Sequence, residues 1–482
     1  MTEPLLSEYH QSGRRAVQLP AIDVPLASLP PGFERSRLPL PELTEPEVLR
    51  HYTRLAHTSL SNMHALQSSG SCTVKYNPVV NEEIAALPGF AQLHPLQPIA
   101  DLQGALHLIH ELGSWLTEIT GLPTVSLQPA AGAQAQLAGL LMIRQFLRQR
   151  GDAEPRDTVL VTATAHGSNP ASAAMAGFKV VTIPHDARGN VDLAVLRASL
   201  SSRVAAFMLT NPNTLGLFEE ESLEIARLVH ASGALLFADG ANLNAIVGKL
   251  RLSDLGVDVT QLNIHKTFST PHGGNGPGAG ALLACAEFEP YLPTPVVVRR
   301  SDGSYDLSED RPLSIGRVRS FYGQFAILVR GYAYILAQGP DGLRRQAEDA
   351  VLHANYVLRR LRETYRPAYE RAHMHEFIVS AGGLGRDLNV RDVASRLMDH
   401  GFHPPNLQAG RVVEAGMLVE PTETETKQSL DAFADALLEV AREAREAPEV
   451  LRSAPHTTPV GRLTPTRPGG VPDVAAGIPL AP

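Results

Sequence analysis

Short apolar runs alternate with helix-like patterns through the middle of this chain, and that alternation restricts the possible folds more than any other feature. The runs are VLVTA (159–163), KVVTI (179–183), AAFMLT (205–210), ALLFADG (234–240), TQLNIH (260–265) and AGALLA (279–284). Helical patterns such as LAVLRASL (193–200) and LEIARLVHASG (223–233) separate most of them. Nearly continuous apolar strands with helices between them predict an α/β fold, with a mainly parallel sheet covered on both faces.

The two ends of the chain differ from this middle part. Residues 1–45 are rich in proline, which blocks long helices and central strands, so we predict an extended arm that packs on another surface. We divide the rest into an N-terminal segment (46–125), a large domain (126–325) and a smaller, mostly helical α+β domain (326–452). Residues 453–482 are again rich in proline and glycine, and they predict a disordered tail.

Composition narrows the setting in which such a chain works. The formal net charge of −8 gives no sign of a nucleic-acid partner. No apolar run reaches the ~18 residues of a membrane span, and the first residues lack the order of a secretory signal. The two cysteines, Cys72 and Cys285, cannot form a disulfide framework. We therefore expect a cytoplasmic protein with no membrane partner.

Three polar residues stand where predicted strands end. Asp239 lies at the end of ALLFADG, His166 lies just past VLVTA, and Lys266 follows TQLNIH and precedes a glycine-rich loop. Ligands of open α/β sheets bind beyond the carboxyl ends of the strands. Taken singly, each residue has an ordinary explanation as a helix cap, a satisfied polar neighbour or a solvated surface charge. Together, they are the parts that pyridoxal 5′-phosphate (PLP) requires.

PLP chemistry gives each of these residues a task, and it calls for no metal. The amine of Lys266 forms a Schiff base with the cofactor aldehyde, and its apolar neighbours favour the neutral amine. The carboxylate of Asp239 keeps the pyridine nitrogen protonated, so that the ring accepts electrons from the substrate. The imidazole of His166 covers the ring and is able to carry protons.

A phosphate site is predicted in the segment SLQPAAGAQ. Its turn leads into a long helix that begins near Ala133, and the free N–H groups and dipole of such a helix favour a dianion. The alternative is a helix start in which the glycine only permits close packing. We take Ala131, Gly132 and Ala133 as cofactor-binding residues, together with His265 beside Lys266.

Long motifs between about residues 48 and 463 resemble one known family. They are RHYTRL (50–55), GSCTVKYNP (70–78), QPAAGAQ (128–134), AHGSNPAS (165–172), TNPNTLGLFE (210–219), DGANLNA (239–245), NIHKTF (263–268), PHGGNGPG (271–278), HGFHPP (400–405) and EPTETETK (420–427). The family is glycine dehydrogenase (decarboxylating) subunit 2, the PLP-bearing half of the split P-protein of the glycine cleavage system.

The resemblance implies a PLP-dependent enzyme of fold type I. In it, Lys266 matches the Schiff-base lysine, Asp239 the partner of the pyridine nitrogen, and His166 the histidine stacked on the ring. It further implies that glycine loses carbon dioxide and that its aminomethyl group passes to the lipoyl group of the H-protein. The expected partner is glycine dehydrogenase subunit 1, in a heterotetramer of two subunit types.

Two further loops belong to these motifs. Asn211 and Asn213 either border the cofactor and substrate or only build a turn, and we include Asn211 among the cofactor-binding residues. The GSCTVKYNP loop is expected to reach the active site or the partner subunit. Its Cys72 is expected to be structural rather than nucleophilic.

The sequence departs from the family pattern at four places, and these leave the substrate open. They are Ser68–Ser69, Ala135–Gln136, Asn275 and the segment NLQAGR (406–411). A divergent PLP-dependent paralogue that acts on another amino acid or another acceptor is therefore the alternative to glycine decarboxylation. A catalytically silent subunit is a third hypothesis, and the intact lysine, aspartate and histidine argue against it.

Overall fold

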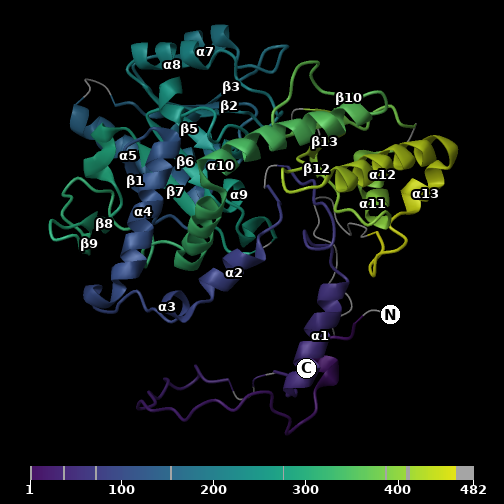
Figure 1. The fold of residues 1–482 in the computed structure, drawn as a ribbon, viewed down its shortest axis with the longest axis horizontal. Helices are drawn as coiled ribbons and strands as arrows, with labels where there is room; N and C mark the ends of the chain where they lie inside the picture. Colours follow the sequence, from purple (N-terminus) through teal and green to yellow (C-terminus); the bar gives the residue numbers. More distant parts are fainter. Residues whose placement is uncertain are drawn as a thin grey trace.

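The structure, a computed structural model, describes residues 3–35, 38, 40–70, 73–151, 155–274, 276–385, 388–408 and 413–462. A seven-stranded sheet lies at its centre, in the order β1-β7-β6-β5-β4-β2-β3 (Figure 1). The strands are β1 (Thr124–Ser126), β2 (Thr158–Thr162), β3 (Lys179–Ile183), β4 (Val204–Thr210), β5 (Leu235–Gly240), β6 (Val259–Asn263) and β7 (Gly280–Ala284). β7 runs antiparallel to β1 and β6, and the remaining neighbouring strands pair in parallel. The predicted α/β fold is confirmed, and each predicted apolar run matches a strand to within two residues.

Helices cover both faces of this sheet and bury a separate core on each. They are α4 (Gln103–Thr120), α5 (Gly132–Arg150), α6 (Ser168–Met175), α7 (Leu193–Ser199), α8 (Ser222–Ala231) and the short α9 (Ile264–Thr267). Within β5, Leu236 enters the core shared with α8, whereas Phe237 enters the core shared with α5. Because alternate side chains enter different cores, both sets must be apolar, and the strand therefore reads as a continuous apolar run.

A second, smaller sheet lies toward the C-terminus, in the order β10-β11-β13-β12. Its elements are β10 (Arg366–Pro367), β11 (Phe377–Ser380), β12 (Asn406–Gln408) and β13 (Gly416–Val419), with α11 (Val390–Asp399), α12 (Lys427–Glu446) and α13 (Pro448–Ser453). The long helix α10 (Phe325–Leu361) joins the two parts: Ile335 packs in the core of the large sheet and Val357 in that of the small sheet. It kinks at Gly339, whose φ is 60°, just before Pro340.

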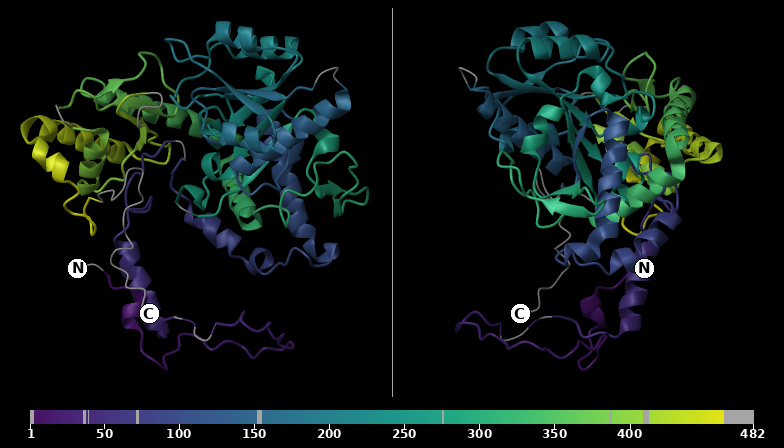
Figure 2. Two further views of the ribbon diagram at one scale, coloured as in Figure 1. Left: turned by 180° about the vertical axis from the view of Figure 1, so that it is seen from behind. Right: turned by 60° about the vertical axis from the view of Figure 1, so that its left-hand side comes forward.

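The N-terminal arm projects from the rest of the molecule (Figures 1 and 2). Leu19 and Leu26 in the arm are 81% and 80% exposed, and its packing on another surface stays a prediction. The remaining elements are η1 (Leu6–Tyr9), α1 (Glu45–His57), α2 (Val79–Ala85), α3 (Pro88–Ala91), η2 (Ile99–Leu102), η3 (Leu243–Ala245), η4 (Leu252–Leu255), η5 (Pro271–Gly274), η6 (Ala286–Tyr291), β8 (Val296–Arg299) and β9 (Tyr305–Ser308). Among the described residues, no helix combines the length and apolar character that crossing a membrane requires. The predicted tail lies outside the described residues from 463 onward.

Candidate active site

The carboxyl ends of β4, β5 and β6 meet at one edge of the large sheet, where they border a cavity of about 240 Å³. The cavity is lined by Ala131, Gly132, Ala133, Gln136, His166, Ser168, Thr210, Thr214, Asp239, Ala241, Asn242, Gln261, Asn263, His265, Lys266 and His272. Lys266, Asp239, His166, His265 and the segment 131–133, which the sequence singled out separately, are thus brought together. Asn211 is not among the lining residues.

Asp239 is held rigidly at the end of β5. Its side chain is 1% exposed, and its two oxygens accept hydrogen bonds from the amides of Asn169 (2.8 Å) and Gln261 and from the backbone N–H of Ala241 (3.1 Å). These donors fix the direction in which the carboxylate faces the cavity. Sequence reasoning missed both Asn169 and Gln261. The available signal was a glutamine inside the otherwise apolar run TQLNIH, directly opposite Asp239 in the β5–β6 register.

Lys266 lies in the single turn of α9 that follows β6. It is 6% exposed, and its neighbours Ile264 and Phe268 are fully buried. The carbonyl oxygen of Thr267 accepts hydrogen bonds from Lys75 (2.8 Å) and Gln346 (2.8 Å), which anchor this turn from two other parts of the chain. The amine of Lys266 is therefore set at the cavity by a fixed backbone.

His166 and His265 lie at the cavity in different environments. His166 contacts Ser168 through Nδ1 (2.8 Å), and loss of surrounding water together with the nearby Lys266 lowers the pKa of its ring, an effect that Asp239 opposes. His265 is 2% exposed, and burial lowers its pKa to about 3, with His272 and Lys266 adding to the effect. Its ring lies 4.1 Å from that of His272 and carries no charge at neutral pH.

The amino end of α5 forms a cradle at the other side of the cavity. Ala131 is the N-cap of this helix, and a Cβ added to Gly132 would lie 2.3 Å from Asn263 Oδ1 and 2.7 Å from Gln261 Oε1. Within the described residues, the buried side-chain oxygens of Gln136, Gln261 and Asn263 have no hydrogen-bond partner. Such buried amides require a polar partner, and the orientation of an amide can reverse to suit it. This end of the cavity therefore fits a small, polar, phosphate-bearing group.

The side chains of Asn211 and Asn213 hold the loop after β4 instead of facing the cavity. Asn211 donates to Ser222 Oγ (2.8 Å) and accepts from the backbone N–H of Glu219 (2.9 Å). Asn213 accepts from the N–H groups of Leu215 and Leu217. These contacts are those of the turn that we gave as the alternative. Thr210 and Thr214, on either side of them, are the residues of this segment that line the cavity.

Gly132→Ala should weaken cofactor binding by about tenfold or more, because the added methyl group has to displace the side chains of Asn263 and Gln261. A fluorescence titration of the apoprotein with PLP measures this effect. Gly167→Ala is the matched control: it lies at the start of α6, its φ is −57°, and an added Cβ meets nothing within 4 Å. Equal affinity of the Gly132 variant and the control would contradict a phosphate cradle at α5.

A buried lysine and a buried aspartate at the ends of neighbouring parallel strands, opposite a helix N-terminus, fit PLP in this fold. The chain is a PLP-dependent enzyme of fold type I. The family described as aminotransferase class-V matches residues 138–278, and the family described as the C-terminal domain of glycine dehydrogenase matches residues 346–456.

Relatives of nearly full length identify the particular family. A protein of Caldanaerobacter subterraneus subsp. tengcongensis is 50% identical over 95% of this chain and 96% of its own length, and one of Bacillus licheniformis is 48% identical over 96% and 97%. Both are named “Probable glycine dehydrogenase (decarboxylating) subunit 2”. The chain belongs to the glycine dehydrogenase (decarboxylating) subunit 2 family.

Solved structures agree with this assignment. A glycine decarboxylase (P-protein) of the glycine cleavage system, in inhibitor-bound form, is 26% identical, with a TM-score of 0.72 over 86% of this chain and 93% of that one. A sphingosine-1-phosphate lyase of Burkholderia pseudomallei, 15% identical with a TM-score of 0.63 over 88% and 94%, shares the fold.

Two of the four departures from the family pattern lie against each other. Ser69 Oγ donates to Asn406 Oδ1 (2.8 Å), and Asn406 Nδ2 donates to the carbonyl oxygen of Gly70 (2.5 Å). Gln136, from a third departure, lines the cavity. Asn275, Cys72 and residues 409–411 lie outside the described residues.

Proposed function

We propose that this chain decarboxylates glycine with PLP and passes the aminomethyl group to the lipoyl group of an H-protein. It does so in the cytoplasm, as one subunit of a heterotetramer with glycine dehydrogenase subunit 1. The observation that carries the proposal is the facing pair at the cavity: Lys266 after β6 and Asp239 at the end of the adjacent β5. The near full-length similarity to the family supports the choice of glycine.

Four parts of the cavity have defined tasks in this reaction. PLP, when bound, supplies an electron-accepting ring that stabilises the electron pair left when the carboxyl group departs. Lys266 holds the cofactor covalently, and Asp239 keeps a proton on the ring nitrogen. The N–H groups at the start of α5 bind the phosphate, and His166 limits how the ring tilts. Asp239 and Lys266 are buried, which limits the access of water to the two groups that would hold the cofactor.

Exchange of labelled bicarbonate into glycine tests the function directly. We expect exchange when the purified chain is combined with subunit 1 and lipoylated H-protein, and a large loss when either partner is omitted. The same mixture with non-lipoylated H-protein is the control, because it preserves protein contacts and removes only the acceptor. Absence of exchange in every combination of partners would refute glycine decarboxylation.

The position of Gln136 at the cavity favours a second candidate function. Because this departure from the family pattern borders the cavity directly, a paralogue with another amino acid as substrate is the alternative function. Titration of the cofactor absorbance with a panel of amino acids separates the two. A spectral response to glycine favours the first function, and a response only to another amino acid favours the second.

A further inference from the structure

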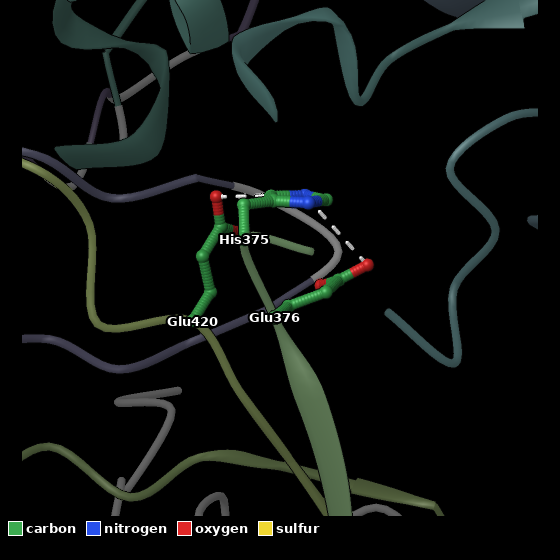
Figure 3. A group of neighbouring side chains, drawn as sticks. All are labelled: His375, Glu376 and Glu420. Atoms are coloured by element: carbon green, nitrogen blue, oxygen red, sulfur yellow. Dashed lines mark ion pairs between the residues drawn. The ribbon is translucent and has the colours of Figure 1, made fainter. Parts of the chain in front are cut away.

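A buried cluster of one histidine and two carboxyl groups lies at one end of the small sheet. His375 and Glu376 immediately precede β11, Glu420 immediately follows β13, and the antiparallel pairing of Phe377 with Val419 brings them together. Their side chains are at most 2% exposed. Figure 3 shows the imidazole of His375 between the two carboxyl groups, and Nε2 lies 3.8 Å from Glu376 and 3.9 Å from Glu420.

The cluster lies directly behind one of the residues that line the cavity. Asn242, which lines the cavity, contacts Glu376 (3.5 Å), and its neighbour Asn244 donates to Glu420 (3.0 Å). Burial lowers the pKa of His375 and raises that of Glu420, and the charge of Lys266 adds to the first effect and opposes the second, so both groups are within its electrostatic reach. Lys266 therefore shares the cavity with one carboxyl group, Asp239, and lies within electrostatic reach of a second, Glu420.

Glu420 has no fixed cation to neutralise it. The nearby Lys75 is already paired with Glu423 (2.6 Å), and among the described residues the only ion-pair partner of Glu420 is His375. Burial lowers the pKa of His375 to about 3, so its ring is neutral and offers no positive charge. Burial also raises the pKa of Glu420 to about 7, against the hydrogen bond from Thr73 and the charge of Lys266. Glu420 thus holds a proton to higher pH than an ordinary carboxyl group does.

The reaction at Lys266 creates a need for such a group. An amino acid arrives in water as an ammonium ion, which has no lone pair. With a cofactor held on Lys266, the substrate nitrogen would have to lose a proton before it could react there and release the lysine. A buried carboxylate without a permanent partner attracts the ammonium ion and offers a place for that proton.

We propose that Glu420 accepts the proton of the incoming substrate ammonium, with His375 and Glu376 as the residues that position it. This inference rests on the proposed function, since it requires a cofactor on Lys266. In the step, one N–H bond of the ammonium breaks, an O–H bond forms on Glu420, and nitrogen keeps the electron pair. The groups that influence the pH dependence around Glu420 are Lys266, His375, Glu376, Glu423, Lys75 and Tyr334.

A metal ion is the competing occupant, because the potential ligand atoms of the cluster lie within 4.8 Å of one another. The hydrogen bonds of Glu420 favour a proton over a metal ion at this cluster. Glu420 Oε1 already accepts from Thr73 (2.7 Å) and from Asn244 (3.0 Å), which takes up both lone pairs of the oxygen that faces His375. That oxygen is therefore not available to a metal ion, and the proposed proton goes to the second oxygen of the carboxylate. A divalent cation here would also face the charge of Lys266.

Two amines of different charge test the proposal in the PLP-loaded chain. Glycine is an ammonium ion at neutral pH, whereas O-methylhydroxylamine is an uncharged amine that needs no proton acceptor. Stopped-flow absorbance of the cofactor band follows the reaction of each amine at Lys266. In Glu420→Gln we expect the glycine reaction to slow about 100-fold at neutral pH, with the O-methylhydroxylamine reaction unchanged. The wild-type glycine rate should rise through pH of about 7, and the variant should lose that rise.

Glu425→Gln is the matched control. Glu425 lies in the same loop, burial also raises its pKa, and it bonds to Ser429 away from the cluster, so both reactions should match those of the wild type. Equal slowing of both amines in Glu420→Gln, or no slowing of either, would overturn the inference. So would one equivalent of a divalent metal in the purified wild-type chain that Glu420→Gln removes. A chain that forms no cofactor band at all overturns the proposed function instead.

Discussion

Lys266→Ala should abolish covalent attachment of PLP and reduce glycine–bicarbonate exchange by at least about 10³-fold. Lys266 supplies the only amine that lines the cavity among the described residues. Alanine removes that amine without adding volume, so the fold around the rigid turn of α9 should persist. The measurement is the mass of the protein after borohydride reduction, in parallel with the exchange assay.

The control for this variant is Lys249→Ala, which removes a surface lysine paired with Glu348 at 2.6 Å. It should retain the borohydride-stable adduct and full exchange, because exposed ion pairs contribute little to stability. An adduct of unchanged mass yield in Lys266→Ala would show that another lysine binds the cofactor. Circular dichroism of both variants separates loss of chemistry from loss of folding.

Asp239→Ala should keep part of the cofactor and lose most of the rate. A carboxylate about 4 Å from a protonated ring nitrogen contributes on the order of 4 kcal/mol at an effective dielectric of 20. Since ~1.4 kcal/mol corresponds to tenfold in rate, we expect a fall of about 10²- to 10³-fold. The amides of Asn169 and Gln261 would also lose their acceptor, which should weaken cofactor binding.

Rates measured at saturating PLP, with a separate cofactor titration, distinguish the two effects of the Asp239 variant. Asp254→Ala is the control, because it removes an exposed carboxylate whose partner is Arg251 at 3.3 Å. Wild-type turnover in Asp239→Ala would mean that a different group faces the ring nitrogen. If Asp239→Ala binds PLP more weakly but keeps the wild-type rate at saturating PLP, then Asp239 contributes to cofactor binding and not to the chemical step.

The large sheet could be predicted from the sequence because its strands are buried on both faces. β4, for example, has no exposed residue over its whole length, so its apolar run stands out against the polar loops around it. The small sheet could not be predicted in the same way. Its strands have two to four residues, and β10 consists of Arg366 and Pro367, so no periodicity can develop.

The residues of the cavity could likewise be predicted from the sequence only in part. Residues at strand ends, such as Asp239 and Lys266, were predictable because parallel strands place their carboxyl ends at one edge. Asn211 also follows a strand, but its amide is used by Ser222 and Glu219, a local competition that sequence does not reveal. Glu420 belongs to the motif EPTETETK (420–427), but the sequence alone assigned it no function. Its position depends on the pairing of β11 with β13, which joins segments far apart in the sequence.

The residues that line the cavity are synthesised before the cluster of His375, Glu376 and Glu420. Every lining residue lies between Ala131 and His272, and the elements that hold them in place, β7 beside β6 and Gln346 of α10, follow later in the chain. The bond between Thr73 and Glu420 joins residues 347 positions apart and waits for almost the entire chain. The cofactor pocket should therefore be complete once α10 has been made, whereas Glu420 reaches its place only after β13 pairs with β11, so the cofactor can bind before the proposed proton acceptor is in position.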